Sequence, residues 1–172
     1  MRPMHTWTVY GLLVLGIAAR LAPHPWNATP TMAIALFAGA YLPKRWALLL
    51  PWAIVAASDV VLGWHDTMPF TWGGFLLAGL LGWWVRISPT PGRVFAAALS
   101  GSALFFLLSN FGVWLLGALY PRTAAGFWEC YLAAIPFFRN ALAGDLVYTA
   151  ALFGGYALAV KALPAHQAVR SG

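Results

Sequence analysis

The chain has 172 residues, of which 62% are hydrophobic and 8% are charged, whereas a soluble domain carries roughly 25% charged residues. This composition excludes a water-facing globular surface and indicates that the lipid bilayer is the solvent. The net charge of +6 is dispersed over short loops, as in membrane proteins, so it does not indicate nucleic-acid binding.

Six apolar runs predict an all-α integral membrane protein, a six-transmembrane-helix bundle that forms a single domain over residues 1–172. The predicted spans are about 7–21, 31–42, 46–63, 70–85, 94–119 and 141–163. We expect the first run to be a helix rather than a signal peptide, because Ala18-Ala19-Arg20 is a poor cleavage site.

Two segments do not fit a simple crossing. The second span is short, so the proline-rich loop before it is expected to dip into the bilayer. The segment 120–140, between the last two spans, is polar at its start and aromatic later. We expect a partly buried helix there, interrupted at Pro136.

Charges are distributed unequally between the two sides of the predicted bundle. Six spans put both termini on one side, which carries seven of the ten Lys and Arg residues. The positive-inside rule therefore predicts that both termini are cytoplasmic. The outer side carries the other three basic residues and all four acidic ones: Arg20, Arg122, Arg139, Asp59, Asp66, Glu129 and Asp145.

Polar residues on four different spans are predicted at a similar depth. At about 1.5 Å per residue, Arg20 and Asp59 lie about 20 Å from the inner ends of their spans. Asn110 and Asp145 lie about 24 Å from theirs. Because the hydrocarbon core is about 30 Å thick, all four reach its outer third, where polar groups must pair or meet water. We expect them to surround a pocket that opens outward.

The predicted binding site combines these residues with their polar and aromatic neighbours. Arg20, Asp59, Asn110 and Asp145 would make polar contacts, and Trp26, Trp64, Trp114 and Tyr131 would stack on the ligand. Its other members are His24, Asn27, His65, Asp66, Cys130, Arg139 and Asn140. Two structural alternatives remain open. Arg20 could pair with Asp59 or Asp145 to lock the bundle, and the aromatic residues could be an interfacial belt.

Cys130, the single cysteine, has three interpretations. It could be an inert small hydrophobe, a soft ligand for cobalt or iron, or a nucleophile with His24 or His65 as base. The sequence has no Gly-Xaa-Ser-Xaa-Gly elbow, no His-Glu-Xaa-Xaa-His pair and no phosphate-binding loop. Without a nucleotide site, the chain is not expected to use ATP by itself.

Five segments combine prolines, aromatic residues and polar residues: Pro23-His24-Pro25-Trp26-Asn27, Ser58-Asp59, Asn110-Phe111-Gly112-Val113-Trp114, Tyr120-Pro121 and the run 130–138. Together they resemble an uncharacterised bacterial family of membrane transport proteins. More remotely, the layout resembles the S-components of energy-coupling-factor vitamin transporters. That resemblance implies a bacterial inner-membrane protein that captures a vitamin or its precursor at the outer face. It also makes Cys130 a candidate ligand to the cobalt of a corrinoid.

The resemblance further implies an ATPase module as partner, but the docking pattern is incomplete. S-components often carry small residues four positions apart on the first helix, and the body of the first span here has none. Ala18 and Ala22 have the spacing but straddle its outer end. The pairs Ala35/Gly39 and Ala53/Ala57 lie in the second and third spans, where we expect packing within the bundle.

The sequence therefore predicts a transport protein that binds a small solute at the outer face and moves it inward. Two alternatives stay open. The first is an intramembrane enzyme that uses Cys130 with a histidine. The second is a non-catalytic subunit of a membrane assembly, which would bind no solute.

Overall fold

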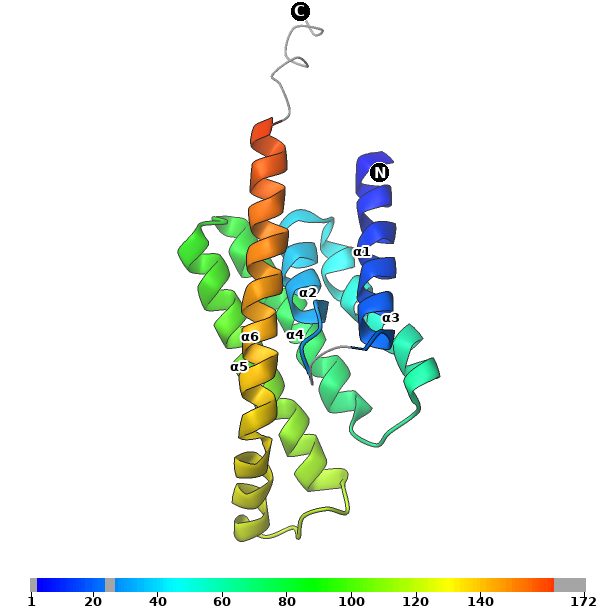
Figure 1. Cartoon of the computed structure of the whole chain (residues 1–172), viewed down its shortest axis with the longest axis vertical. Helices are drawn as coiled ribbons and strands as arrows, with labels where there is room; N and C mark the ends of the chain where they lie inside the picture. Colours follow the sequence, from blue (N-terminus) through cyan, green and yellow to red (C-terminus); the bar gives the residue numbers. More distant parts are fainter. Residues whose placement is uncertain (1–2, 24–26, 163–172) are drawn as a thin grey trace, which may run out of the picture.

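The computed structural model describes residues 3–23 and 27–162. In this part of the chain all regular secondary structure is α-helical. The helices are α1 Pro3–Leu21, α2 Thr31–Tyr41, α3 Lys44–Leu62, α4 Met68–Ile87, α5 Pro91–Leu116 and α6 Ala124–Ala162 (Figure 1). Four of them, α3 to α6, are long and apolar enough to cross a membrane, whereas α2 and the apolar part of α1 are shorter. The all-α fold is confirmed, and each predicted span overlaps one helix.

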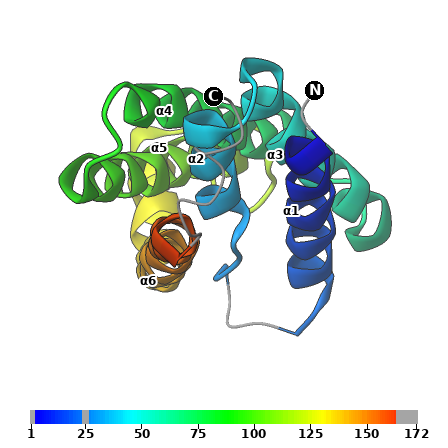
Figure 2. The ribbon, with the colours of Figure 1, turned by 90° about the horizontal axis from the view of Figure 1, so that it is seen from above.

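The short helix α2 is the centre of the bundle. It contacts all five other helices, and the residues from Thr31 to Ala40 are all buried. Figure 2 shows α1 and α3 on one side of α2 and α6 on the other. Because protein rather than lipid surrounds α2, it does not have to match the bilayer thickness, which accounts for its length of 11 residues.

The buried carboxyl end of α2 is capped by a side chain from α4. Helix ends leave carbonyl groups without intrahelical partners, and these are costly to bury unpaired. Arg86 donates hydrogen bonds from Nε and Nη2 to the Gly39 carbonyl oxygen, at 2.8 and 2.6 Å, and from Nη2 to the Leu42 carbonyl. One guanidinium therefore pairs with two carbonyl groups at the end of the central helix.

Glycines let α2, α3 and α4 approach at backbone distance. A Cβ atom added to Gly82 would lie 2.7 Å from the Cα atom of Gly39, and one added to Gly79 would collide with the Ala47 carbonyl oxygen. Ala35 is fully buried, so the Ala35/Gly39 pair packs within the bundle as predicted. In the other pair, Ala57 is exposed on the surface of α3.

The structure corrects the division between a segment 120–140 and a sixth span 141–163. α6 is one helix of 39 residues and continues through Pro136, where the sequence predicts an interruption. A proline removes only one backbone hydrogen bond, and packing against α5 and α2 stabilises the helix as a whole. At about 1.5 Å per residue α6 is about 58 Å long, so it exceeds a hydrocarbon core of about 30 Å.

The connections between helices gather at two ends of the molecule. The start of α1, the α2–α3 and α4–α5 turns and the last turn of α6 lie at one end (Figure 1). The loops 63–67 and 117–123 lie toward the other, which we call the distal end. In the predicted topology the distal end is the outer one.

Candidate binding cavity

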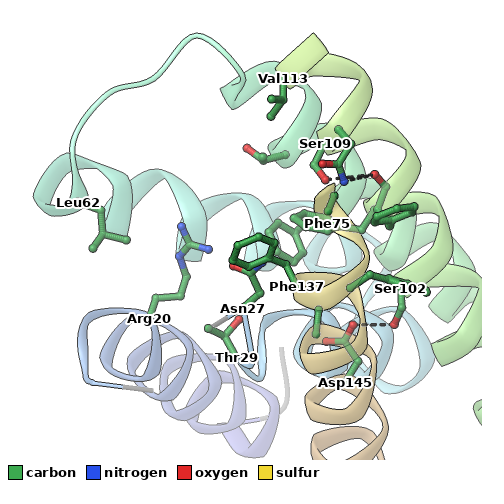
Figure 3. A pocket seen from close by; sticks show the side chains of 17 residues that line it. Arg20, Asn27, Thr29, Leu62, Phe75, Ser102, Ser109, Val113, Phe137 and Asp145 are labelled. Carbon is green, nitrogen blue, oxygen red and sulfur yellow. Dashed lines mark hydrogen bonds between the residues drawn. The ribbon is translucent and has the colours of Figure 1, made fainter. Parts of the chain in front are cut away.

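A cavity of about 540 Å³ lies between α1, α3, α4, α5 and α6, with the loop before α2 forming part of its wall (Figure 3). Leu62 at the end of α3, Thr71 near the start of α4 and Val113 near the end of α5 line it, so it lies toward the distal end. Its polar lining residues are Arg20, Asn27, Thr29, Thr71, Ser102, Ser109, Asn110 and Asp145. Its aromatic lining residues are Phe75, Phe105, Phe106, Phe137 and Phe138.

Arg20 contributes to the cavity wall and is also part of a buried ion pair. Its Nη2 atom donates to Asp59 Oδ1 at 2.6 Å, and its Nε atom donates to Ser58 Oγ at 2.6 Å. The other oxygen of Asp59 accepts a hydrogen bond from Trp72 Nε1 at 2.8 Å. This network joins α1, α3 and α4, so of the two pairings left open for Arg20 the structure shows the one with Asp59.

Asp145 is the second buried carboxylate, on α6, and it lines the cavity directly. Ser102 on α5 donates a hydrogen bond to its Oδ2 atom at 2.6 Å (Figure 3). Within residues 3–23 and 27–162, no basic side chain forms an ion pair with Asp145. An intramembrane carboxylate without a counter-charge is costly to bury, which marks Asp145 as a candidate functional group.

The phenylalanine side chains of the lining form packed pairs. The rings of Phe75 and Phe105 have centroids 4.6 Å apart, and those of Phe106 and Phe138 lie 4.7 Å apart. Sequence reasoning missed these residues because it selected tryptophan and tyrosine, which prefer the membrane interface. The one available signal was depth, since Phe105 and Phe106 lie about one helical turn before Asn110, and Phe137 and Phe138 lie about two turns before Asp145.

The structure brings together part of the predicted site. Arg20, Asn27, Asn110 and Asp145 line the cavity, and Asp59 lies directly behind Arg20. Trp64, His65 and Asp66 are exposed on the loop 63–67, and Arg139 and Asn140 are exposed on α6. His24 and Trp26 lie outside the described residues.

The predicted stacking residues Trp114 and Tyr131 are engaged elsewhere. Trp114 Nε1 donates to the Pro121 carbonyl oxygen at 3.1 Å, and Tyr131 Oη donates to the Leu107 carbonyl oxygen at 2.7 Å. Their rings pack against Phe127, near the start of α6. Neither residue lines the cavity, and their cluster instead ties the distal ends of α5 and α6 together.

Cys130 packs against α5 and does not line the cavity. It is 2% exposed, and its Sγ atom lies 3.5 Å from the Asn110 carbonyl oxygen rather than on the cavity wall. His65 Nδ1 is hydrogen-bonded to Thr67 Oγ1, within its own loop. Among the described residues, no group of three or more His, Cys, Asp and Glu side chains could hold a metal ion. A single bond from Cys130 to the cobalt of a corrinoid is not tested by these observations and stays a prediction.

The fold and composition indicate a helical membrane protein, with a cavity toward one end that is polar on some walls and aromatic on others. Residues 2–166 match DUF6580, a family of unknown function, so the chain belongs to that family. No curated protein and no solved structure matches the chain. The function must therefore be argued from the cavity itself.

Proposed function

We propose that the chain is a bacterial inner-membrane transport protein that binds a small solute, such as a vitamin or its precursor, in the distal cavity and moves it inward. The cavity carries this proposal. Its volume of about 540 Å³ falls within the range of small-molecule sites, about 300 to 1,000 Å³. Its combination of aromatic walls with a few convergent polar groups is also typical of such sites.

A second cavity supports a route through the protein. It has a volume of about 450 Å³ and is lined by residues that include Ala98 of α5 and Leu146 and Thr149 of α6. These lie next to Ser102 and Asp145 of the first cavity, so the two cavities follow one another along the α5–α6 interface. The Ser102–Asp145 hydrogen bond lies at their boundary. The hydroxyl of Thr149 is buried and has no hydrogen-bond partner in the described structure, which leaves a polar group beside the second cavity.

An aromatic cluster packs α2 against α6 beside this second cavity. Tyr41 and Tyr156 have ring centroids 4.3 Å apart, and Phe37 and Phe153 lie 5.4 Å apart. Tyr41 and Phe153 also line the second cavity. In the proposed cycle the solute is held at Asp145 while this cluster is packed, and release requires α6 to separate from α2.

The outward orientation of the cavity is part of the proposal and follows from the positive-inside rule. The proposal does not require an ATPase module. The Ala18/Ala22 pair lies at the distal end of α1, away from the side where a cytoplasmic partner would bind. On α3 the second alanine of the Ala53/Ala57 pair is exposed, so this helix offers the alternative docking surface.

The proposal is tested by filling the cavity. Ala141 lines it, whereas Ala143 on the same helix is exposed and does not. The wild-type protein and the Ala141→Phe and Ala143→Phe variants, purified in mild detergent, are incubated with a small-molecule extract of bacterial cells. Retained solutes are identified by mass spectrometry, and their uptake is measured in proteoliposomes.

We expect Ala141→Phe to reduce solute retention and uptake at least about tenfold, because the ring occupies ligand volume. Ala143→Phe should behave as the wild-type protein does. If the wild-type protein retains no solute, or if both variants retain and transport it equally, the cavity is not a transport site.

A further inference from the structure

Among the residues that the structure describes, the charges around the distal cavity do not cancel. Arg20 is neutralised by Asp59, which lies directly behind it and is only 2% exposed. Asp145 has no comparable partner in the part of the chain that the structure describes, since its hydrogen bond comes from the neutral hydroxyl of Ser102. When Asp145 is ionised, the described cavity wall together with Asp59 behind it therefore carries an excess of one negative charge.

Three neutral polar side chains of the lining, Thr71, Ser109 and Asn110, donate a hydrogen bond to a backbone carbonyl of the protein. Thr71 donates to the Met68 carbonyl oxygen at 3.1 Å, and Ser109 donates to that of Phe106 at 3.5 Å. Asn110 Nδ2 also donates to the Phe106 carbonyl oxygen, at 2.8 Å. A hydroxyl has one hydrogen but two lone pairs, so Thr71 and Ser109 retain acceptor capacity for a ligand, whereas the Asn110 amide retains its oxygen and one N–H. The two hydroxyls therefore favour a ligand that offers hydrogen-bond donors.

Aromatic rings complete the same pattern. Five phenylalanine side chains line the cavity, and two packed pairs among them build part of its wall. The face of a phenyl ring attracts cations and accepts apolar groups, and the attraction increases where water is excluded. The Asp145 carboxylate and the ring faces thus favour a positively charged ligand, and the acceptor oxygens favour one that donates hydrogen bonds.

We propose that the distal cavity selects a small organic cation, in which a protonated amine binds Asp145 and an apolar or aromatic body packs among the phenylalanine rings. This inference rests on the proposed function, because it assumes that the cavity binds a solute. An ammonium group would supply the counter-charge that Asp145 lacks among the described residues. An anionic solute would instead place a second negative charge beside Asp145.

Three probes of similar shape test the charge preference: 2-phenylethylamine, 2-phenylethanol and phenylacetate. Each is titrated at neutral pH against the detergent-purified protein, and the thermal unfolding midpoint is followed by tryptophan fluorescence, because ligands that bind the native state raise this midpoint. We expect the amine to bind about tenfold more tightly than the alcohol, and phenylacetate to bind most weakly. Asp145→Asn should remove the preference for the amine. Glu129→Gln, which removes an exposed carboxylate on the same helix, should preserve it.

Two other outcomes would contradict the cation preference. If the alcohol or phenylacetate binds as tightly as the amine, and Ala141→Phe abolishes that binding, the cavity is a solute site but does not select cations. If none of the three probes stabilises the wild-type protein at about 10 mM, the selectivity for small aromatic cations is rejected. The solute site itself is rejected only if the wild-type protein also retains no solute from the cell extract. The comparison of probes on the wild-type protein remains decisive even if Asp145→Asn does not fold.

Discussion

Asp59 and Asp145 are both buried within the helical bundle, but their partners differ. Both oxygens of Asp59 accept hydrogen bonds, one from the guanidinium of Arg20 and one from the indole of Trp72. Asp145 accepts one from Ser102 and has no cationic partner among the described residues. Loss of one partner from a buried ion pair destabilises the fold, because the other charge is left uncompensated. A buried carboxylate without a cationic partner instead lowers the stability of the fold, and such groups within membranes usually serve function.

This difference predicts opposite effects on stability. Asp59→Asn should lower the free energy of unfolding by about 3 kcal/mol, because it leaves the largely buried guanidinium of Arg20 without its counter-charge. Asp145→Asn should leave stability unchanged or raise it, because it removes an uncompensated charge and retains an acceptor for Ser102. Unfolding by SDS in mixed micelles, followed by tryptophan fluorescence, measures both effects. Equal losses would show that Asp145 is mainly structural.

At the scale of residues, the sequence predicted the polar wall of the cavity better than its aromatic wall. Counting residues along the helices gave similar depths for Arg20, Asn110 and Asp145, and all three line the cavity. Depth alone does not give the rotation of a helix about its axis. Because lipid-facing and buried positions of α5 are both apolar, the pattern could not show that Phe105 lines the cavity while Trp114 does not.

At the scale of helices, the crossing of α2 and α4 depends on residues without side chains. The backbones meet at Gly39 and Gly82, and a Cβ atom at Gly82 would come within 2.7 Å of the Gly39 Cα atom. A backbone contact of this kind cannot be relieved by a change of rotamer. Gly73, which lies on α4 as Gly82 does, has open space where a Cβ atom would lie.

Gly82 and Gly73 of α4 give a matched pair of substitutions. Gly82→Ala should destabilise the protein by about 2 kcal/mol or more, because α2 and α4 must separate. Gly73→Ala should be neutral or stabilising by up to about 1 kcal/mol, because alanine favours the helix. Unfolding in mixed micelles measures both values. If Gly82→Ala proves as stable as Gly73→Ala, the close α2–α4 crossing is wrong.

Helix positions were largely predictable, but two features depended on tertiary contacts. Hydropathy located each helix because apolar runs report burial in lipid or protein. It could not separate these two environments, so the central position of α2 was not apparent from its short apolar run. Pro136 was read as an interruption, although the packing of α6 against α5 and α2 allows the helix to continue.

At the scale of the whole molecule, the proposed direction of transport depends on which side of the membrane the distal end faces. The cavity lies toward the end that carries the loops 63–67 and 117–123. The α4–α5 turn lies at the opposite end, close to Arg86 and Arg93. The positive-inside rule places such basic turns in the cytoplasm, so the distal cavity should be accessible from outside.

Labelling of single cysteines tests this orientation. Cys130 is 2% exposed and is replaced by serine to give a background without a thiol. Asp66→Cys and Pro89→Cys then report on exposed positions at opposite ends of the bundle. We expect a membrane-impermeant maleimide to label Asp66→Cys in intact cells and Pro89→Cys only after permeabilisation. The reverse pattern would place the cavity on the cytoplasmic side, where a cationic solute bound at Asp145 would be a candidate for export rather than uptake.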